Sequence, residues 1–148
     1  MIVRYGLLVA ALAFPGLAHA QTAADSSAIR ATALDYVEGW YEGNAQRMSR
    51  AVHPELVKRI VESDTATKHS VIETMGATAL VNGARHGWGR KTPADRRQKD
   101  VTILDIFGKA ASVKTVMADW IDYMQMAKVD GRWVIVNVLW ETKPGSRE

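Results

Sequence analysis

The strongest constraint on the fold lies near the C-terminus, where residues 119–141 read DWIDYMQMAKVDGRWVIVNVLWE. The Asp130-Gly131 pair separates two runs of β-branched and aromatic residues, which is the strongest short-range signal for a β-hairpin. A strand that is apolar on both faces must be covered on both faces, and a polar Asn137 within it needs a hydrogen-bond partner. The second run has this character, with one parity made of Trp133, Ile135 and Leu139 and the other of Val134, Val136, Val138 and Trp140.

Helical periodicity dominates the chain before this region. Apolar residues between Ile29 and Trp40 recur at helical spacing and predict a helix from Ala28 to Gly43. A short helix follows from Ala45 until Pro54, where the proline ring prevents continuation. A third helix is predicted from Met75 to about Arg85, with Thr74 as its N-cap, and an exposed loop over 86–97.

The remaining apolar runs predict strands. Short strands are expected at 56–61 and 70–73, and longer ones at 101–106, 111–118, 121–129 and 132–141. Helices followed by antiparallel strands predict an α+β fold, with N-terminal helices packed on one face of a curved antiparallel sheet. The other face of the sheet would be a large exposed apolar patch on a monomer, so we expect a homodimer that buries the outer sheet face.

The first twenty residues have the pattern of a secretory signal peptide. Arg4 precedes an apolar run over 7–17, and Ala18-His19-Ala20 is a small-x-small cleavage site. The apolar run is too short to span a bilayer, so we expect cleavage after Ala20, a periplasmic or secreted product and no stable membrane insertion. The predicted organisation is a signal peptide over 1–20, a linker over 21–27, one domain over 28–141 and a frayed tail over 142–148.

Composition excludes several classes of chemistry. The chain has no cysteine, which rules out thiol catalysis, thiolate metal sites and disulfides. The histidines after the signal, at 53, 69 and 86, form no ligand-spaced pair, so no metal is predicted, and no cofactor motif is present. The formal net charge of +3 is concentrated in residues 90–100 and lacks the aromatic-studded basic face of a nucleic-acid binder.

Three stretches carry a resemblance to a known family. They are ALDYVEGWYEGNAQRM at 33–48, VHPELVKR at 52–59, and the β-rich region from DVTILDI to DGRWVIVNVLW at 100–140. In these the chain resembles the nuclear transport factor 2-like superfamily, and within it the putative lumazine-binding branch. The resemblance implies a cone-shaped α+β fold, a concave pocket between helices and sheet, and dimerisation through the outer sheet face. The superfamily includes isomerases, dehydratases, epoxide hydrolases and non-catalytic binders, so the fold does not select a function.

Two residues are candidates for acid–base catalysis. His53 lies next to Pro54 near the wide end of the expected cone, and would need a carboxylate to orient it as a general base. The alternative is that its ring caps the preceding helix or packs beneath a loop. Asp122 could act as a base with a raised pKa in an apolar pocket, but Asp119 and Asp122 are equally explained as turn residues.

The candidate ligand-binding residues are mostly aromatic. One of Lys58 and Arg59 at most can point inward, because neighbouring strand residues face opposite sides, and Trp140 is assigned to the dimer face. Asn137 either reaches a ligand or holds a neighbouring backbone group. An aromatic stripe at helical spacing is also a normal core feature, so packing is the competing interpretation. The candidate set is Tyr36, Trp40, Tyr41, Arg59, Trp120, Tyr123 and Asn137.

Three functional hypotheses follow from the sequence. The first is an exported protein that binds a small hydrophobic or aromatic molecule in an apolar-aromatic pocket. The second is an isomerase or dehydratase-like lyase that transfers protons in the same pocket through Asp122 or His53. The third is a non-catalytic interaction module whose cone is filled by its own side chains.

Overall fold

The computed structural model describes residues 16–146, with side chains described from residue 23 onward. Most of the predicted signal peptide therefore lies outside the described residues. Within them, no helix combines the length and the apolar character needed to cross a bilayer.

Three helices and six strands make up the domain. The helices are α1 (Gly16–Glu42), α2 (Ala45–Ala51) and α3 (Ala77–Arg85). The strands are β1 (Val52–Ser63), β2 (Ser70–Gly76), β3 (Asp100–Phe107), β4 (Ala110–Val116), β5 (Trp120–Val129) and β6 (Arg132–Thr142). The loop predicted at 86–97 contains two short 3-10 helices, η1 (Trp88–Lys91) and η2 (Ala94–Arg96).

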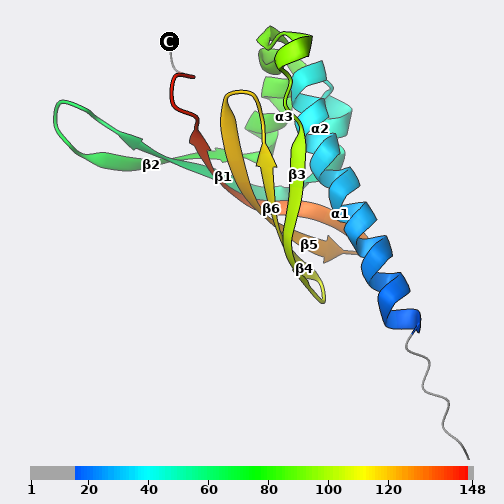
Figure 1. Ribbon diagram of the computed structural model, residues 1–148. Coiled ribbons are helices and arrows are strands. Elements are labelled where there is room, and N and C mark those ends of the chain that lie inside the picture. The colour runs from blue at the N-terminus through cyan, green and yellow to red at the C-terminus, as the bar shows by residue number, and fades with distance from the viewer. Residues whose placement is uncertain (1–15, 147–148) are drawn as a thin grey trace, which may run out of the picture.

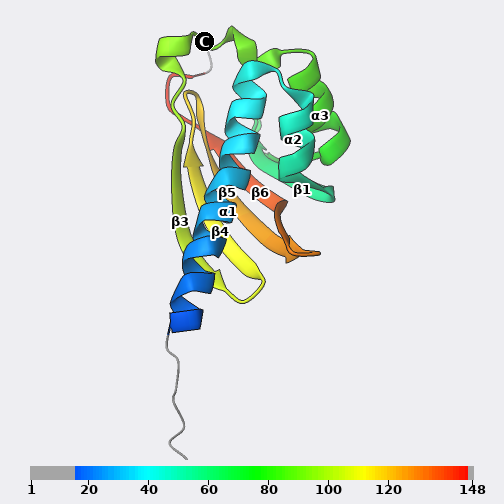
Figure 2. The same cartoon turned by 90° about the vertical axis from the view of Figure 1, so that its right-hand side faces the viewer.

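The strands form one mixed sheet in the order β2-β1-β6-β5-β4-β3. All neighbouring strands are antiparallel except β1 and β6, which run parallel. The three helices lie on one face of this sheet, with α1 running along it and α2 and α3 beside its upper half (Figures 1 and 2). The predicted α+β class, with helices packed on one face of the sheet, is confirmed. The sheet is mixed rather than wholly antiparallel as predicted, because β1 and β6 run parallel.

Several predicted boundaries are wrong. Helix α2 ends at Ala51 rather than at Pro54, which lies within β1, and β1 begins at Val52 rather than at residue 56. Residues 21–27 continue helix α1 instead of forming a linker. Thr74 pairs with Arg59 inside β2, so α3 begins only at Ala77, with Gly76 as its N-cap. The predicted tail begins too early, because Thr142 belongs to β6 and the next residue is held as well: the Lys143 amide donates to Asp119 O at 2.8 Å and its ammonium donates to Gln98 at 2.7 Å.

A β-bulge at Val136 decides which side chains of β6 face the core. Gln125 pairs with Asn137 while Met126 pairs with Ile135, so Val136 has no partner in β5. Ile135 is buried before the bulge, and Val138, three positions later, is buried after it. The sequence analysis assumed that alternate residues of this strand face the same side along its whole length. That prediction is wrong, because the extra residue at the bulge exchanges the two faces in the middle of the strand.

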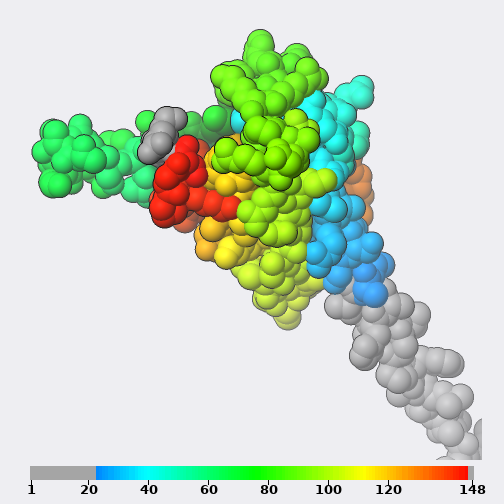
Figure 3. Space-filling model, turned by 45° about the horizontal axis from the view of Figure 1, so that its top comes forward, coloured from blue at the N-terminus to red at the C-terminus, as the bar shows by residue number. Residues whose placement is uncertain are grey.

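The β1–β2 hairpin projects from the body of the domain (Figures 1 and 3). Its distal residues Val71 and Ile72 are exposed, since no helix extends far enough to cover them. The hydrophobic core instead lies where α1, α2 and α3 meet the central strands.

We expect Gly131→Ala to lower the free energy of unfolding by about 1–2 kcal/mol. Gly131 has φ 79° in the Asp130-Gly131 turn, and an L-residue is disfavoured in that left-handed region. The added Cβ would meet no atom within 4 Å, so the loss would come from the backbone.

Urea unfolding of Gly131→Ala and of a control variant at the same position, Gly131→Asn, measures this effect. Asn adopts the left-handed region more readily than Ala, because its short polar side chain can hydrogen-bond locally. The control should therefore lose no more than about half as much stability as Gly131→Ala. Equal losses in the two variants would contradict the assignment to backbone conformation.

Candidate functional site

A cavity of about 100 Å³ lies between α1, α3 and the concave face of the sheet. Its walls are aromatic and aliphatic, and Lys58 is the one charged residue among those that line it. The lining residues are Tyr36 and Trp40 from α1, Lys58 from β1, Met75 from β2, Leu80 from α3, Met117, Trp120 and Trp140.

Three tryptophans form one continuous wall. The Trp120 ring lies 6.0 Å from Trp40 and 6.1 Å from Trp140, with interplanar angles of 81° and 76°. These edge-to-face contacts are favourable for aromatic pairs and hold each ring in a defined orientation. The 3-10 helix η1 packs against Trp40 of this wall. Gly89 of η1 lies so close that an added Cβ would be 2.3 Å from Trp40 O.

A buried ion pair forms the floor of the cavity. The Lys58 ammonium donates to Asp122 Oδ1 and to the Tyr36 hydroxyl, the latter at 2.7 Å. Lys58 is 6% exposed and Asp122 is 0% exposed. The Thr115 hydroxyl donates to the second Asp122 oxygen at 3.4 Å, and the Lys58 ammonium lies 4.7 Å from the centre of the Trp140 ring.

Burial shifts the pKa of two groups in this cluster. Desolvation lowers the pKa of Lys58, although the charge of Asp122 and its hydrogen bond act in the opposite direction. Desolvation, and next the charge of Asp122, raise the pKa of Tyr36 well above its ordinary value. The Tyr36 phenol therefore stays protonated over the physiological pH range.

Four of the predicted site residues belong to this region. Tyr36, Trp40 and Trp120 line the cavity as predicted. Asp122 lies behind the floor and contacts Lys58 rather than the cavity itself. It occupies strand β5 and not a turn, so the turn interpretation of Asp122 is wrong.

Three other predicted residues lie on the outer face of the sheet. Arg59 donates to Asn137 Oδ1, and Asn137 donates in turn to Gln125. Tyr123 is exposed on the same face, where its strand partner is Leu139. The predicted pocket positions of Arg59, Tyr123 and Asn137 are therefore wrong. Asn137 satisfies its polar group through two side chains rather than through a ligand or the backbone.

Tyr41 is a core residue rather than a wall of the cavity. Its hydroxyl donates to Gln98 O at 3.0 Å and accepts from the Ala118 amide at 2.8 Å. These two bonds tie α1 to the segments on either side of β3 and β4. The prediction that Tyr41 lines the pocket is wrong, and the packing interpretation applies to it.

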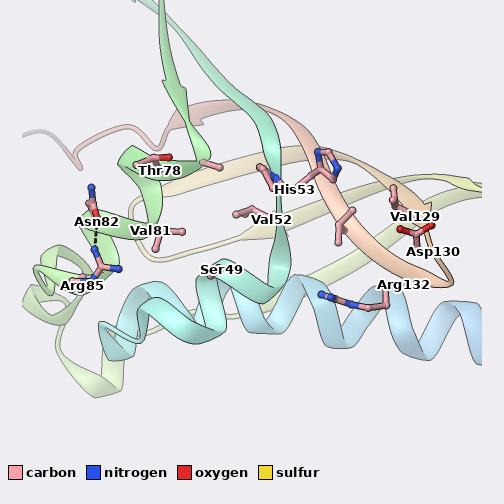
Figure 4. A pocket seen from close by; sticks show the side chains of 13 residues that line it. Ser49, Val52, His53, Thr78, Val81, Asn82, Arg85, Val129, Asp130 and Arg132 are labelled. Atoms are coloured by element: carbon pink, nitrogen blue, oxygen red, sulfur yellow. Dashed lines mark hydrogen bonds between the residues drawn. The ribbon is translucent and has the colours of Figure 1, made fainter.

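His53 lies in a separate open hollow of about 570 Å³ beside α3. Figure 4 shows it on the same side of the hollow as Asp130 and Arg132 of the β5–β6 hairpin, with Asn82 and Arg85 of α3 across the space. Its Nδ1 accepts from the Glu55 amide at 3.2 Å, and within residues 23–146 no carboxylate is hydrogen-bonded to the ring. The structure therefore does not bring His53 together with Asp122.

Sequence reasoning missed two residues that line the cavity, Lys58 at its floor and Trp140 in its wall. The run Leu56 to Val61 is apolar at both parities, so the sequence alone could not decide between Lys58 and Arg59. Trp140 was assigned to the outer face, and the Val136 bulge turns it inward. Over the residues described, no group of three histidine or acidic side chains could hold a metal ion.

The fold is of the nuclear transport factor 2-like type, as comparison with solved structures shows. A nuclear transport factor 2-like protein of unknown function from Shewanella baltica matches with a TM-score of 0.62 and 19% identity, over 83% of this chain and 97% of that one. A protein with a cystatin-like fold from Novosphingobium aromaticivorans matches with a TM-score of 0.62 and 14% identity, over 88% and 90% of the two chains.

A third solved structure carries a functional description. It is a putative scytalone dehydratase from Novosphingobium aromaticivorans, with a TM-score of 0.57 and 13% identity over 84% of this chain and 88% of that one. At this identity the likeness shows the fold alone. The comparison with curated proteins gives no match.

The family model described as putative lumazine-binding matches residues 24–141. This range covers most of the chain, and the protein belongs to that family. The resemblance seen in the sequence is therefore confirmed for both the superfamily and the branch.

Removing the carboxylate of the floor should be strongly destabilising. We expect Asp122→Ala to lower the free energy of unfolding by about 3–5 kcal/mol, because it leaves a buried ammonium without its counter-charge. The double variant Lys58→Met and Asp122→Leu removes both charges and should recover most of that loss. Urea unfolding of the unmodified protein, Asp122→Ala, Lys58→Met and the double variant measures the coupling. A loss in the double variant that equals the sum of the two single losses would contradict the ion pair.

Proposed function

We propose that this protein binds a small aromatic molecule in the cavity between α1, α3 and the sheet. The observation that carries the proposal is the combination of a tryptophan wall with one charged residue, Lys58, at the floor. Apolar cavities with a few convergent polar groups are the usual form of small-molecule sites.

The size of the cavity sets the scale of the ligand. An engineered apolar cavity of about 150 Å³ accepts benzene in another protein. The present volume of about 100 Å³ suits a single ring once small movements of Met75 and Met117 are allowed, since methionine side chains adapt readily. The cone is therefore incompletely filled by its own side chains, which favours binding over the interaction-module hypothesis.

The site gives less support to acid–base catalysis by the residues that were predicted for it. Asp122 is fully buried and is separated from the cavity by Lys58, so it does not face a substrate. His53 lines a different hollow. An isomerase or dehydratase-like lyase remains the second candidate, and its proton acceptor would be Lys58, whose pKa is lowered by burial.

Export to the cell envelope is part of the proposal. It rests on the sequence pattern of the first twenty residues, which predicts a signal peptide cut after Ala20. N-terminal sequencing of the protein recovered from its native cells would test it, with Gln21 expected as the first residue.

Native mass spectrometry of protein recovered from its native cells tests the binding function. We expect the native protein to carry an additional mass that is lost on denaturation. The released compound should show the ultraviolet absorbance of an aromatic ring. A protein free of ligand at every preparation, and unable to bind any small aromatic probe, would overturn the proposal.

A cavity-filling variant should block binding. We expect Leu80→Phe to weaken binding of nitrobenzene, followed through quenching of tryptophan fluorescence, by about tenfold or more, because the larger ring occupies the cavity. Leu80→Met conserves volume and is the matched control, expected within about twofold of the unmodified protein. If the unmodified protein and both Leu80 variants bind nitrobenzene with equal affinity, the probe binds outside this cavity.

We also propose that the outer sheet face forms a homodimer. Its centre carries Leu139, which is 51% exposed, beside Tyr123 and near Val61 at 46%. A second copy would bury these side chains through a self-complementary contact.

Sedimentation velocity tests the dimer. We expect Leu139→Asp to give a monomer at micromolar concentration, because it buries an unpaired carboxylate in the contact. The control is Val71→Asp, at an exposed residue of the projecting hairpin that pairs with Glu62 and faces the opposite side. A monomer in the unmodified protein would overturn the proposal.

A further inference from the structure

The cavity contains one amine, that of Lys58, among walls that are otherwise unreactive. The other lining side chains are aromatic, aliphatic or thioether groups, and the Tyr36 phenol stays protonated because burial raises its pKa. Lys58 is the one buried lysine among residues 23–146. Burial lowers the pKa of its ammonium, although Asp122 acts in the opposite direction. A desolvated lysine in an apolar pocket is the arrangement that forms Schiff bases with carbonyl compounds.

The ion pair with Asp122 determines the charge of a ligand that can meet Lys58. The two residues are buried and are neutral as a pair, so a charged ligand beside them would lack a counter-charge. A neutral carbonyl compound avoids this cost. Its condensation with an ammonium group gives a protonated imine, which keeps the positive charge that Asp122 already balances. The total charge of the buried cluster is therefore the same before and after the reaction.

The hydrogen bonds of the ammonium match those that a protonated imine needs. Of the three N–H groups of Lys58, one bonds to Asp122 and one to the Tyr36 hydroxyl, and the third has no acceptor among the described residues. A protonated imine has one N–H, which the Asp122 carboxylate retains, and the other two hydrogens leave with the carbonyl oxygen as water. The Lys58 nitrogen lies 4.7 Å from the centre of the Trp140 ring, which also favours a cation at this position.

Resting on the proposed function, we infer that Lys58 captures neutral, single-ring aromatic aldehydes as protonated imines. The ring of the aldehyde lies against the tryptophan wall, its carbonyl carbon lies at the Lys58 nitrogen, and its oxygen lies within reach of the Tyr36 hydroxyl. A cavity of about 100 Å³ leaves no room for a second large substituent on the carbonyl carbon, so an aldehyde fits better than a ketone.

The reaction balances with no co-reactant. A proton passes from Lys58 to Asp122 along their hydrogen bond, and the free amine forms a C–N bond as the π electrons of the carbonyl move to its oxygen. That oxygen takes a proton from the nitrogen, which gives a carbinolamine. It then leaves as water with the proton of the Tyr36 hydroxyl, while the nitrogen lone pair forms the C=N bond. The proton held by Asp122 restores the Tyr36 hydroxyl through the hydrogen-bonded Lys58 nitrogen.

Reductive trapping with benzaldehyde and sodium cyanoborohydride tests the inference. The reductant converts a protonated imine into a stable secondary amine, so each captured aldehyde adds one benzyl group, which peptide mapping by mass spectrometry locates. We expect Lys58 of the folded protein to be labelled at least about tenfold faster than Lys109, an exposed lysine of the same chain. In urea-denatured protein the two rates should agree within about threefold, because the cavity is lost.

A variant that fills the cavity shows whether the reaction depends on it. Leu80→Phe should slow the labelling of Lys58 at least about tenfold, because the larger ring occupies the space of the aldehyde. The matched control is Leu104→Phe, the same substitution at an exposed residue of β3, which should leave the rate within about twofold of the unmodified protein. Circular dichroism checks that both variants are folded. The comparison of Lys58 with Lys109 in the unmodified protein decides the inference even where Leu80→Phe does not fold.

The outcomes separate the two proposals. Labelling of Lys58 no faster than that of Lys109 in the folded protein would overturn the inference. Labelling that persists in folded Leu80→Phe would also overturn it, because the reaction would not need the cavity. If nitrobenzene binds in the cavity while benzaldehyde leaves Lys58 unlabelled, the aldehyde inference fails and the aromatic-binding function stands. If neither probe enters the cavity, the function and the inference fail together.

Discussion

The buried ion pair between Lys58 and Asp122 lies where three elements of the fold meet. It joins β1 to β5 across β6, and the bond from Lys58 to Tyr36 extends it to α1. A buried pair of charges is weak evidence for net stability, since desolvation offsets most of the attraction. Its position at the floor of the largest aromatic cluster therefore fits a functional role better than a purely structural one.

The Val136 bulge determines what surrounds that pair. Because the extra residue exchanges the faces of β6, Val138 and Trp140 turn inward beside Lys58, while Leu139 turns outward. Without the bulge Trp140 would lie on the outer face, and the tryptophan wall would lose one of its three rings. A one-residue irregularity thus shapes both the cavity and the outer face, as bulges near functional sites commonly do.

The sequence predicted the elements well where a periodic signal was long and poorly where it was ambiguous. The Asp130-Gly131 hairpin, the paired strands around it and the helix break at Gly43 all follow from local chemistry that tertiary packing reinforces. The choice between Lys58 and Arg59 failed because their strand is apolar at both parities. Trp140 and Asn137 were misplaced because nothing in the sequence marks the bulge. Such register shifts depend on the neighbouring strand, which a single segment does not encode.

The chemistry of the cavity follows from an imbalance between donors and acceptors. Both oxygens of Asp122 are engaged, yet the Lys58 ammonium and the Tyr36 hydroxyl together hold more N–H and O–H groups than the protein accepts. In a site shielded by tryptophans, an oxygen that enters is bound more strongly than in water, because fixed donors need no reorganisation. In the proposed function, hydrogen bonding at the Lys58 end of the cavity and ring shape along the tryptophan wall together set the selectivity.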